Sequence, residues 1–155
     1  MRAILRDLAL DRCPPFFRDW QFVAALAAGL VFWVVLAAAT TGGRSPAWKL
    51  SVVLSLCLIQ PLIEELIFRG ALQGELLRRS WGQKTWSGIS VANGATSIAF
   101  TALHFVSHPP LWAASVLIPS LLFGYFRERH ASLYPPLCLH IYYNTGYFFT
   151  TGFPI

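Results

Sequence analysis

Long apolar runs separated by short polar patches dominate this chain. The runs cover about residues 20–41, 49–79, 85–106, 111–126 and 131–149. A helix that crosses a hydrocarbon core of about 30 Å needs roughly 20 apolar residues, and the runs are close to that length. A glycine- and proline-containing turn at 42–46 separates the first two. The pattern therefore predicts an all-α, polytopic membrane helix bundle of about five transmembrane helices.

The composition supports a membrane protein and leaves little chain for a soluble domain. Hydrophobic residues make up 55% of the sequence and charged residues only 12%, which is well below the charged fraction of a typical soluble domain. Residues 1–19 form a polar segment whose scattered charges do not resemble the short basic region of a cleavable signal peptide. We therefore expect a single integral-membrane domain over 1–155, with its core at 50–146.

The basic residues flank the apolar runs, as topology determinants do. The formal net charge of +5 therefore indicates membrane anchoring, with the lipid bilayer as a partner, rather than nucleic-acid binding. If all five runs cross the membrane, one side carries Arg2, Arg6, Arg12, Arg18, Arg78, Arg79, Lys84, Arg127 and Arg129, and the other carries Arg44 and Lys49. The positive-inside rule then places the N-terminus in the cytoplasm, with the chain in a cell membrane that we expect to be prokaryotic.

Three charged residues lie inside the second apolar run, where charge is costly. On insertion scales each charge at a bilayer centre costs on the order of 2.5 to 3.5 kcal/mol. Glu65 and Arg69 are four residues apart, so a helix brings them together as an ion pair, whereas Glu64 points in another direction. A buried ion cluster could simply fix helix packing. Glu64, an additional intramembrane acid, is the stronger candidate for chemistry.

Two other apolar runs carry polar residues of complementary chemistry. His104 lies near the end of the third run, and His140 and Asn144 share one face of the fifth because they are four residues apart. Each could serve only as an interhelical hydrogen-bonding group. Together with a carboxylate they could also activate water and hold a developing oxyanion, which is what peptide hydrolysis requires. No GxSxG setting for a nucleophilic serine is present.

These residues form three short motifs that resemble a known family. The stretches "EELIFRG", "FTALH" and "HIYYN" resemble, in order, the EExxxR, FxxxH and HxxxN motifs of the CPBP intramembrane proteases, also called the Abi or type II CAAX protease family. The resemblance implies a glutamic-type, formerly metallo-type, intramembrane endopeptidase without a cofactor. It implies that Glu64 activates water with His104, that Glu65 and Arg69 support the site, and that His140 and Asn144 form the oxyanion hole.

The sequence leaves alternatives open for the substrate, for a metal cofactor and for the class of function. The substrate is expected to be a membrane-associated or C-terminally tagged peptide or protein, and a prenylated one is not implied. Zinc held by Glu64, His104 and His140 is a weaker alternative, because no HExxH motif is present. A non-enzymatic immunity or assembly partner would use the polar cluster only for packing. A transporter has the least support, because no inverted repeat is evident.

Overall fold

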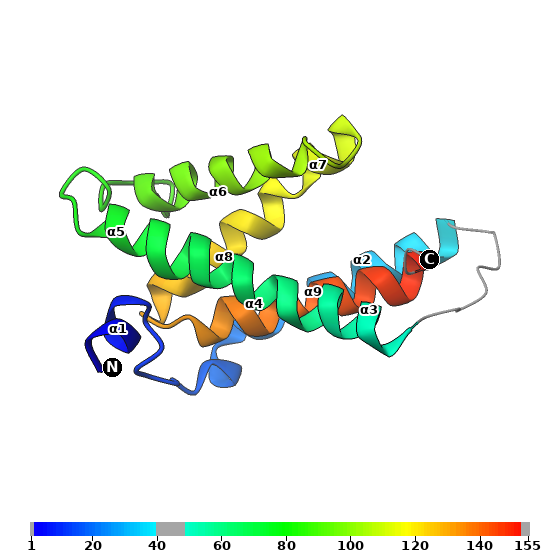
Figure 1. Cartoon of the computed structure of the whole chain (residues 1–155), viewed down its shortest axis with the longest axis horizontal. Coiled ribbons are helices and arrows are strands. Elements are labelled where there is room, and N and C mark those ends of the chain that lie inside the picture. Colours follow the sequence, from blue (N-terminus) through cyan, green and yellow to red (C-terminus); the bar gives the residue numbers. More distant parts are fainter. Residues whose placement is uncertain (1, 40–48, 153–155) are drawn as a thin grey trace. The chain divides into compact units, whose positions relative to one another are not determined.

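The chain folds into helices and one short β-hairpin in the computed structural model, which describes residues 2–39 and 49–152 (Figure 1). The helical elements are α1 (Arg2–Asp7), the 3-10 turn η1 (Phe16–Arg18), α2 (Trp20–Ala39), α3 (Leu50–Leu54), the π-helical η2 (Ser55–Ile59), α4 (Gln60–Glu65), the π-helical η3 (Leu66–Leu72), α5 (Gln73–Leu77), α6 (Val91–His104), α7 (Pro110–Ser115), α8 (Leu117–Arg129) and α9 (Tyr134–Thr151). The strands β1 (Thr85–Trp86) and β2 (Ile89–Ser90) pair in antiparallel fashion. The predicted turn at 42–46 lies outside the described residues.

The predicted helical class is confirmed, since 76% of the structure is helix and 3% is strand. Two helical stretches, Trp20–Ala39 and Leu50–Leu77, are long and apolar enough to cross a membrane. Only 17% of the most apolar window of each is buried within the protein, unlike the core helix of a soluble domain. The prediction of five spans is not confirmed, because α6 and α8 contain 14 and 13 residues, fewer than the roughly 20 that a full span needs.

The third predicted helix begins later than the apolar pattern indicated. Residues 85–90, expected to be helical, form the hairpin of β1 and β2 instead. Ser87 and Gly88 have φ of 50° and 83°, and two consecutive positive φ values are typical of the tight turn that joins two antiparallel strands. Ser90 then starts α6, where its side chain accepts a hydrogen bond from the backbone N–H of Asn93.

The fourth predicted helix is divided into α7 and α8. Pro119 has no backbone N–H and crowds the carbonyl four residues earlier, that of Ser115, and α7 ends at Ser115. The fifth predicted helix begins at Tyr134 rather than near Ala131, because Ala131 has φ of 46° and lies outside helical geometry. Both differences arise from local backbone chemistry that hydrophobicity does not report.

The described residues divide into two compact units, and the chain passes between them after Pro14, within α4 and within α9. The first unit comprises residues up to 14 together with 64–136, and the second comprises 15–63 and the residues from 137 onward. The expected single membrane domain stays a prediction.

In the first unit, α5 and α6 lie side by side and run antiparallel, and the segment that contains the hairpin joins them at one end (Figure 1). Four phenylalanines, Phe68, Phe100, Phe123 and Phe126, are buried in this unit together with many polar side chains. The N-terminal segment joins this unit through an ion pair of 2.6 Å between Asp7 and Arg78. The backbone N–H of Leu133 also donates to the carbonyl of Ala9 at 2.8 Å. The polar N-terminus is therefore partly built into the fold.

In the second unit, aromatic side chains of α9 pack against α2. The hydroxyls of Tyr142 and Tyr143 donate to the carbonyls of Leu26 and Ala25 at 3.1 and 2.9 Å. The Tyr142 ring also contacts Trp33, with 4.4 Å between ring centroids. These bonds satisfy the polar ends of aromatic residues within an apolar helix pair.

Gly124 allows α8 to approach α6 closely. A Cβ at Gly124 would overlap the side chain of Asn93, which is held by hydrogen bonds to Leu121 at 3.0 Å and from Ser97 at 3.0 Å. We therefore expect Gly124→Ala to lower the free energy of unfolding by about 1 to 3 kcal/mol.

Gly94 provides a matched control for this substitution, which denaturant unfolding in detergent would measure. A Cβ at Gly94 meets no atom within 4 Å, so Gly94→Ala should leave stability unchanged or raise it by up to about 1 kcal/mol. Equal effects of the two substitutions would contradict the close packing of α6 and α8.

Candidate active site

Glu65 and Arg69 form the ion pair predicted from their spacing. The Nη1 atom of Arg69 lies 3.3 Å from Oε1 of Glu65, and both side chains are 0% exposed. An unpaired charge in such an environment would be strongly unfavourable, and pairing with hydrogen bonds reduces this penalty. The acidic motif thus contributes a buried, mutually neutralised pair.

Arg69 is further held by α8 and by two aromatic rings. Its Nη2 donates to the Ser120 hydroxyl at 2.6 Å and to the Ser120 carbonyl at 3.0 Å. Its guanidinium carbon lies 4.6 Å from the centroid of the Phe100 ring and 5.4 Å from that of Phe123. Cation–π contacts of this kind are stronger where water is excluded. The orientation of the guanidinium is therefore defined from several sides.

The EExxxR motif lies in the continuous helical stretch of α4, η3 and α5, called the motif helix below. This helix is π-helical after Glu65, whereas the sequence predicted a regular α-helix. At its end the N–H of Gln73 donates to the carbonyl of Phe68, five residues earlier. The Arg69 carbonyl, which would accept this N–H in an α-helix, instead accepts a hydrogen bond from Nε of Arg127 at 3.2 Å. Single π-helical turns within α-helices occur frequently at functional sites.

The position of Arg127 corrects one part of the charge pattern. Arg127 was counted as a charge outside the membrane that helps to set topology, but it is 8% exposed and bonded within the protein. Burial lowers the pKa of its guanidinium, whereas the carboxylates of Glu128 and Asp11 raise it. The cytoplasmic placement of the N-terminus stays a prediction that rests on the remaining basic residues.

Glu64 directly precedes the buried pair in the sequence and differs from Glu65 in its surroundings. Its side chain is partly buried, whereas that of Glu65 is fully buried. A partly buried carboxylate is accessible to water, whereas one enclosed in a fully buried ion pair is not. This difference agrees with the division of roles inferred from helical spacing.

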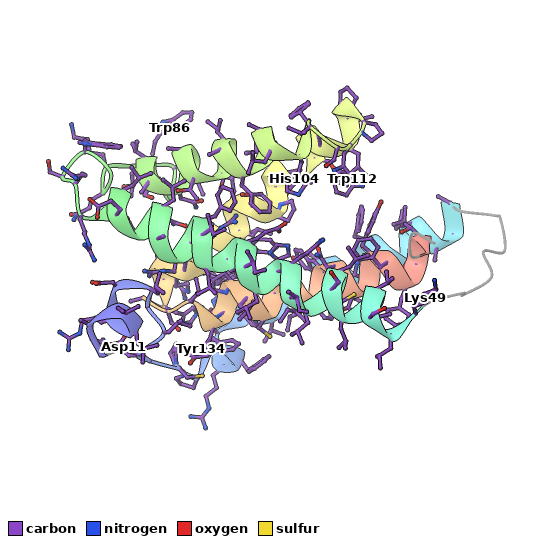
Figure 2. The ribbon with its side chains drawn as sticks, viewed as in Figure 1. Asp11, Lys49, Trp86, His104, Trp112 and Tyr134 are labelled. Atoms are coloured by element: carbon purple, nitrogen blue, oxygen red, sulfur yellow. The ribbon has the colours of Figure 1, made fainter. Side chains whose placement is uncertain are left out.

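His104 is oriented by the backbone of its own helix. Its Nδ1 lies 2.9 Å from the carbonyl oxygen of Phe100, and a carbonyl only accepts, so Nδ1 carries the proton. In the neutral ring, Nε2 is then the atom that can accept one. Figure 2 shows His104 next to Trp112, and their ring centroids are 5.9 Å apart.

The Phe100 ring contacts both Arg69 and His104, two of the predicted site residues. Its ring centroid lies 4.6 Å from the guanidinium carbon of Arg69 and 4.6 Å from the centroid of the His104 ring. Phe68, from the motif helix, meets it edge to face at 5.0 Å. The first unit thus brings Arg69, and with it Glu65, to the same aromatic side chain as His104.

In the second unit, Asn144 satisfies a carbonyl that the helix pattern leaves open. Gln60 donates its N–H to Ser55, five residues earlier, and Pro61 has no N–H. Neither residue can therefore supply a donor to the carbonyl of Leu56, and Nδ2 of Asn144 donates to it at 3.0 Å. An amide nitrogen carries two protons, so one remains for another acceptor.

His140 belongs to the same helix as Asn144 and is 5% exposed. The two residues are four apart in α9 and share a helix face, as predicted. Glu64, Glu65, Arg69 and His104 belong to the first unit, and His140 and Asn144 to the second. That all six form one site stays a prediction.

For the zinc alternative, no three His, Cys, Asp or Glu side chains come close enough to hold a metal ion within residues 2–39 and 49–152. The expectation that the enzyme needs no cofactor stays a prediction, and zinc stays its alternative.

Sequence reasoning missed the contribution of α8 to the site. Ser120, Gly124 and Arg127 all contact the motif helix: Ser120 holds Arg69, the Gly124 carbonyl accepts from Gln73 at 3.1 Å, and Arg127 holds the Arg69 backbone. Their spacing of four and three residues places them on one face of α8, and this shared face can be recognised in the sequence.

Two apolar, largely unburied helices are consistent with an integral membrane protein. The buried acid–guanidinium pair contacts the same phenylalanine as an oriented imidazole. Residues 46–146 match the family model described as "Type II CAAX prenyl endopeptidase Rce1-like", and the chain belongs to this family. The predicted family is therefore confirmed, and membership points to a CAAX-type intramembrane protease. No curated protein and no solved structure matches the chain significantly.

Proposed function

We propose that the protein is a glutamic intramembrane endopeptidase in which Glu64 activates the attacking water. The observation that carries this proposal is the family match, because its range of 46–146 contains all three polar motifs. Within the first unit, the different surroundings of Glu64 and Glu65 and the defined tautomer of His104 support it.

In this mechanism Glu64 accepts a proton from water, and the hydroxyl attacks the carbonyl carbon of the scissile peptide bond. Nε2 of neutral His104 shares or relays this proton and later delivers it to the leaving amine. Arg69 pairs with Glu65, so that Glu64 is not adjacent to an uncompensated second carboxylate. No covalent enzyme intermediate is needed.

His140 and Asn144 are proposed to stabilise the oxyanion that develops on the scissile carbonyl. Prearranged donors in a site shielded from water often contribute most to acyl-transfer catalysis. The burial of His140 and the fixed amide of Asn144 suit this role. Because one amide proton of Asn144 is directed to Leu56, its second proton would serve the oxyanion.

The substrate is proposed to be a membrane-associated peptide or protein cut near its C-terminus. The family description supports a CAAX-type substrate, and the two exposed apolar helices suit an enzyme within the bilayer, where lipid-anchored chains lie. A prenyl group is one anchor that such a substrate could carry.

The experiment that tests this proposal compares two neighbouring histidines. We expect His104→Ala to lower kcat for a CAAX-type peptide by about 100-fold or more, in the range that general acid–base groups contribute. His108→Ala is the matched control, because His108 is exposed and lies four residues further on. Cleavage retained in His104→Ala would refute the mechanism.

The same assay distinguishes the zinc alternative. We expect wild-type cleavage to persist after dialysis against a strong chelator, with metal bound at much less than one ion per chain. Loss of activity on chelation, with recovery on addition of zinc, would instead favour a metal-dependent enzyme.

A further inference from the structure

Three residues on one face of α8 form hydrogen bonds with the motif helix. Ser120 binds the guanidinium of Arg69, Gly124 offers its carbonyl to Gln73, and Arg127 binds the backbone carbonyl of Arg69. All these contacts lie within the first unit. Arg69 is thus held at both its side chain and its backbone by the same helix.

Ser120 has the most direct influence on the charged pair. Within the described residues, the hydrogen bonds of the Arg69 guanidinium go to Ser120 alone, through Nη2, whereas its Nε and Nη1 make none. Nη1 faces Glu65 at the longer distance of 3.3 Å. Because a guanidinium is planar and rigid, fixing Nη2 also fixes the direction of Nη1.

We propose that Ser120 is a positioning residue of the peptidase, which sets the orientation of Arg69 and, through it, the position of Glu65 beside Glu64. This inference rests on the proposed function. Ser120 does not contact the reacting atoms; it acts through the arginine. A small rotation of the guanidinium would change the electrostatic field at Glu64, and misplacement of about 1 Å in an active site can reduce the rate by about 100-fold.

Two substitutions distinguish the hydrogen bond from simple packing. Ser120→Ala removes the hydroxyl, and Ser120→Cys nearly preserves the volume but replaces the strong acceptor with a weak one. We expect both to lower kcat by about tenfold or more, with KM changed by less than about twofold, because the loss affects the chemical step rather than binding.

Ser97→Ala is the matched control. Ser97 is also fully buried, and its hydroxyl makes one side-chain hydrogen bond, to Asn93 at 3.0 Å, but it does not contact Arg69. Thermal unfolding of each variant in detergent would show the folded fraction, and rates would be expressed per folded molecule. Ser97→Ala should retain wild-type kcat.

Two results would overturn the proposal. The first is a kcat of Ser120→Ala within about twofold of that of Ser97→Ala, and the second is a wild-type kcat in Ser120→Cys, which would show that volume alone matters. A Glu64→Gln variant in the same assay separates this failure from that of the proposed function. If Glu64→Gln still cleaves, the mechanism itself is wrong, whereas its inactivity beside a fully active Ser120→Ala refutes only the role of Ser120.

Discussion

Replacement of Glu64 by glutamine is expected to abolish peptide cleavage, with kcat reduced by at least about 1,000-fold, within the range that general bases contribute. Glutamine has nearly the same shape but cannot accept a proton from water. The measurement is the single-turnover rate of the purified protein in lipid bilayers with a CAAX-type peptide.

The matched control for this prediction is Glu75→Gln. Glu75 belongs to the same helical stretch, but its side chain is 50% exposed and pairs with Arg78 and Arg79. Exposed pairs of this kind contribute little, so Glu75→Gln should cleave at close to the wild-type rate. Full activity of Glu64→Gln would contradict the peptidase mechanism and would favour a protein whose polar cluster serves only packing.

Replacement of Arg69 by methionine is expected to cause the largest loss of stability. The substitution leaves the Glu65 carboxylate fully buried without its cation, and breaking a buried pair in this way typically costs about 3 to 5 kcal/mol. It also removes the hydrogen bonds to Ser120 and the contacts with Phe100 and Phe123. Denaturant unfolding in detergent would measure the change.

The double variant Glu65→Leu/Arg69→Met tests the reason for this loss. Because it removes both charges and keeps apolar volume, it should recover most of the stability that Arg69→Met loses, while remaining inactive. Arg79→Met, at a side chain that is 61% exposed, should change stability little. A double variant no more stable than Arg69→Met would show that the instability does not come from the unpaired carboxylate.

The sequence predicted the features that depend on composition and spacing. The apolar runs at Trp20–Ala39 and Leu50–Leu77 and the ion pair between Glu65 and Arg69 are all present in the structure. They were predictable because an intramembrane charge needs a partner, and a helix brings residues four apart together. The family was predicted separately, from the resemblance of three short polar motifs to those of a known family, and the family match confirms it.

The backbone irregularities were not predictable in the same way. Thr85, Trp86 and Ile89 are apolar or β-branched and extend the hydrophobic run, yet the turn at Ser87 and Gly88 makes them a hairpin. The π-helical turns change which carbonyls are available to side chains, and hydrophobicity carries no information about them. Their effects are visible in the bonds from Asn144 and Arg127.

Tertiary burial accounts for the remaining differences. Arg127 lies at the end of an apolar run, where a basic residue usually marks the membrane boundary, but α8 turns it toward the motif helix and buries it. The sequence could have indicated this through the shared face of Ser120, Gly124 and Arg127. The hydrophobic pattern of a single segment does not show which other helix packs against that face.

The central claim is that the acid of the first unit and the donors of the second unit act on one scissile bond. The most direct test is the distance between the Glu64 carboxylate and the His140 ring in an experimental structure determined in a lipid bilayer. We predict that Glu64, His104 and His140 converge on one small space, with the carboxylate and the His104 ring within hydrogen-bonding reach of one water and the His140 ring within reach of the adjoining position of the scissile carbonyl. A separation of Glu64 and His140 that one water and a peptide carbonyl cannot bridge would contradict the claim.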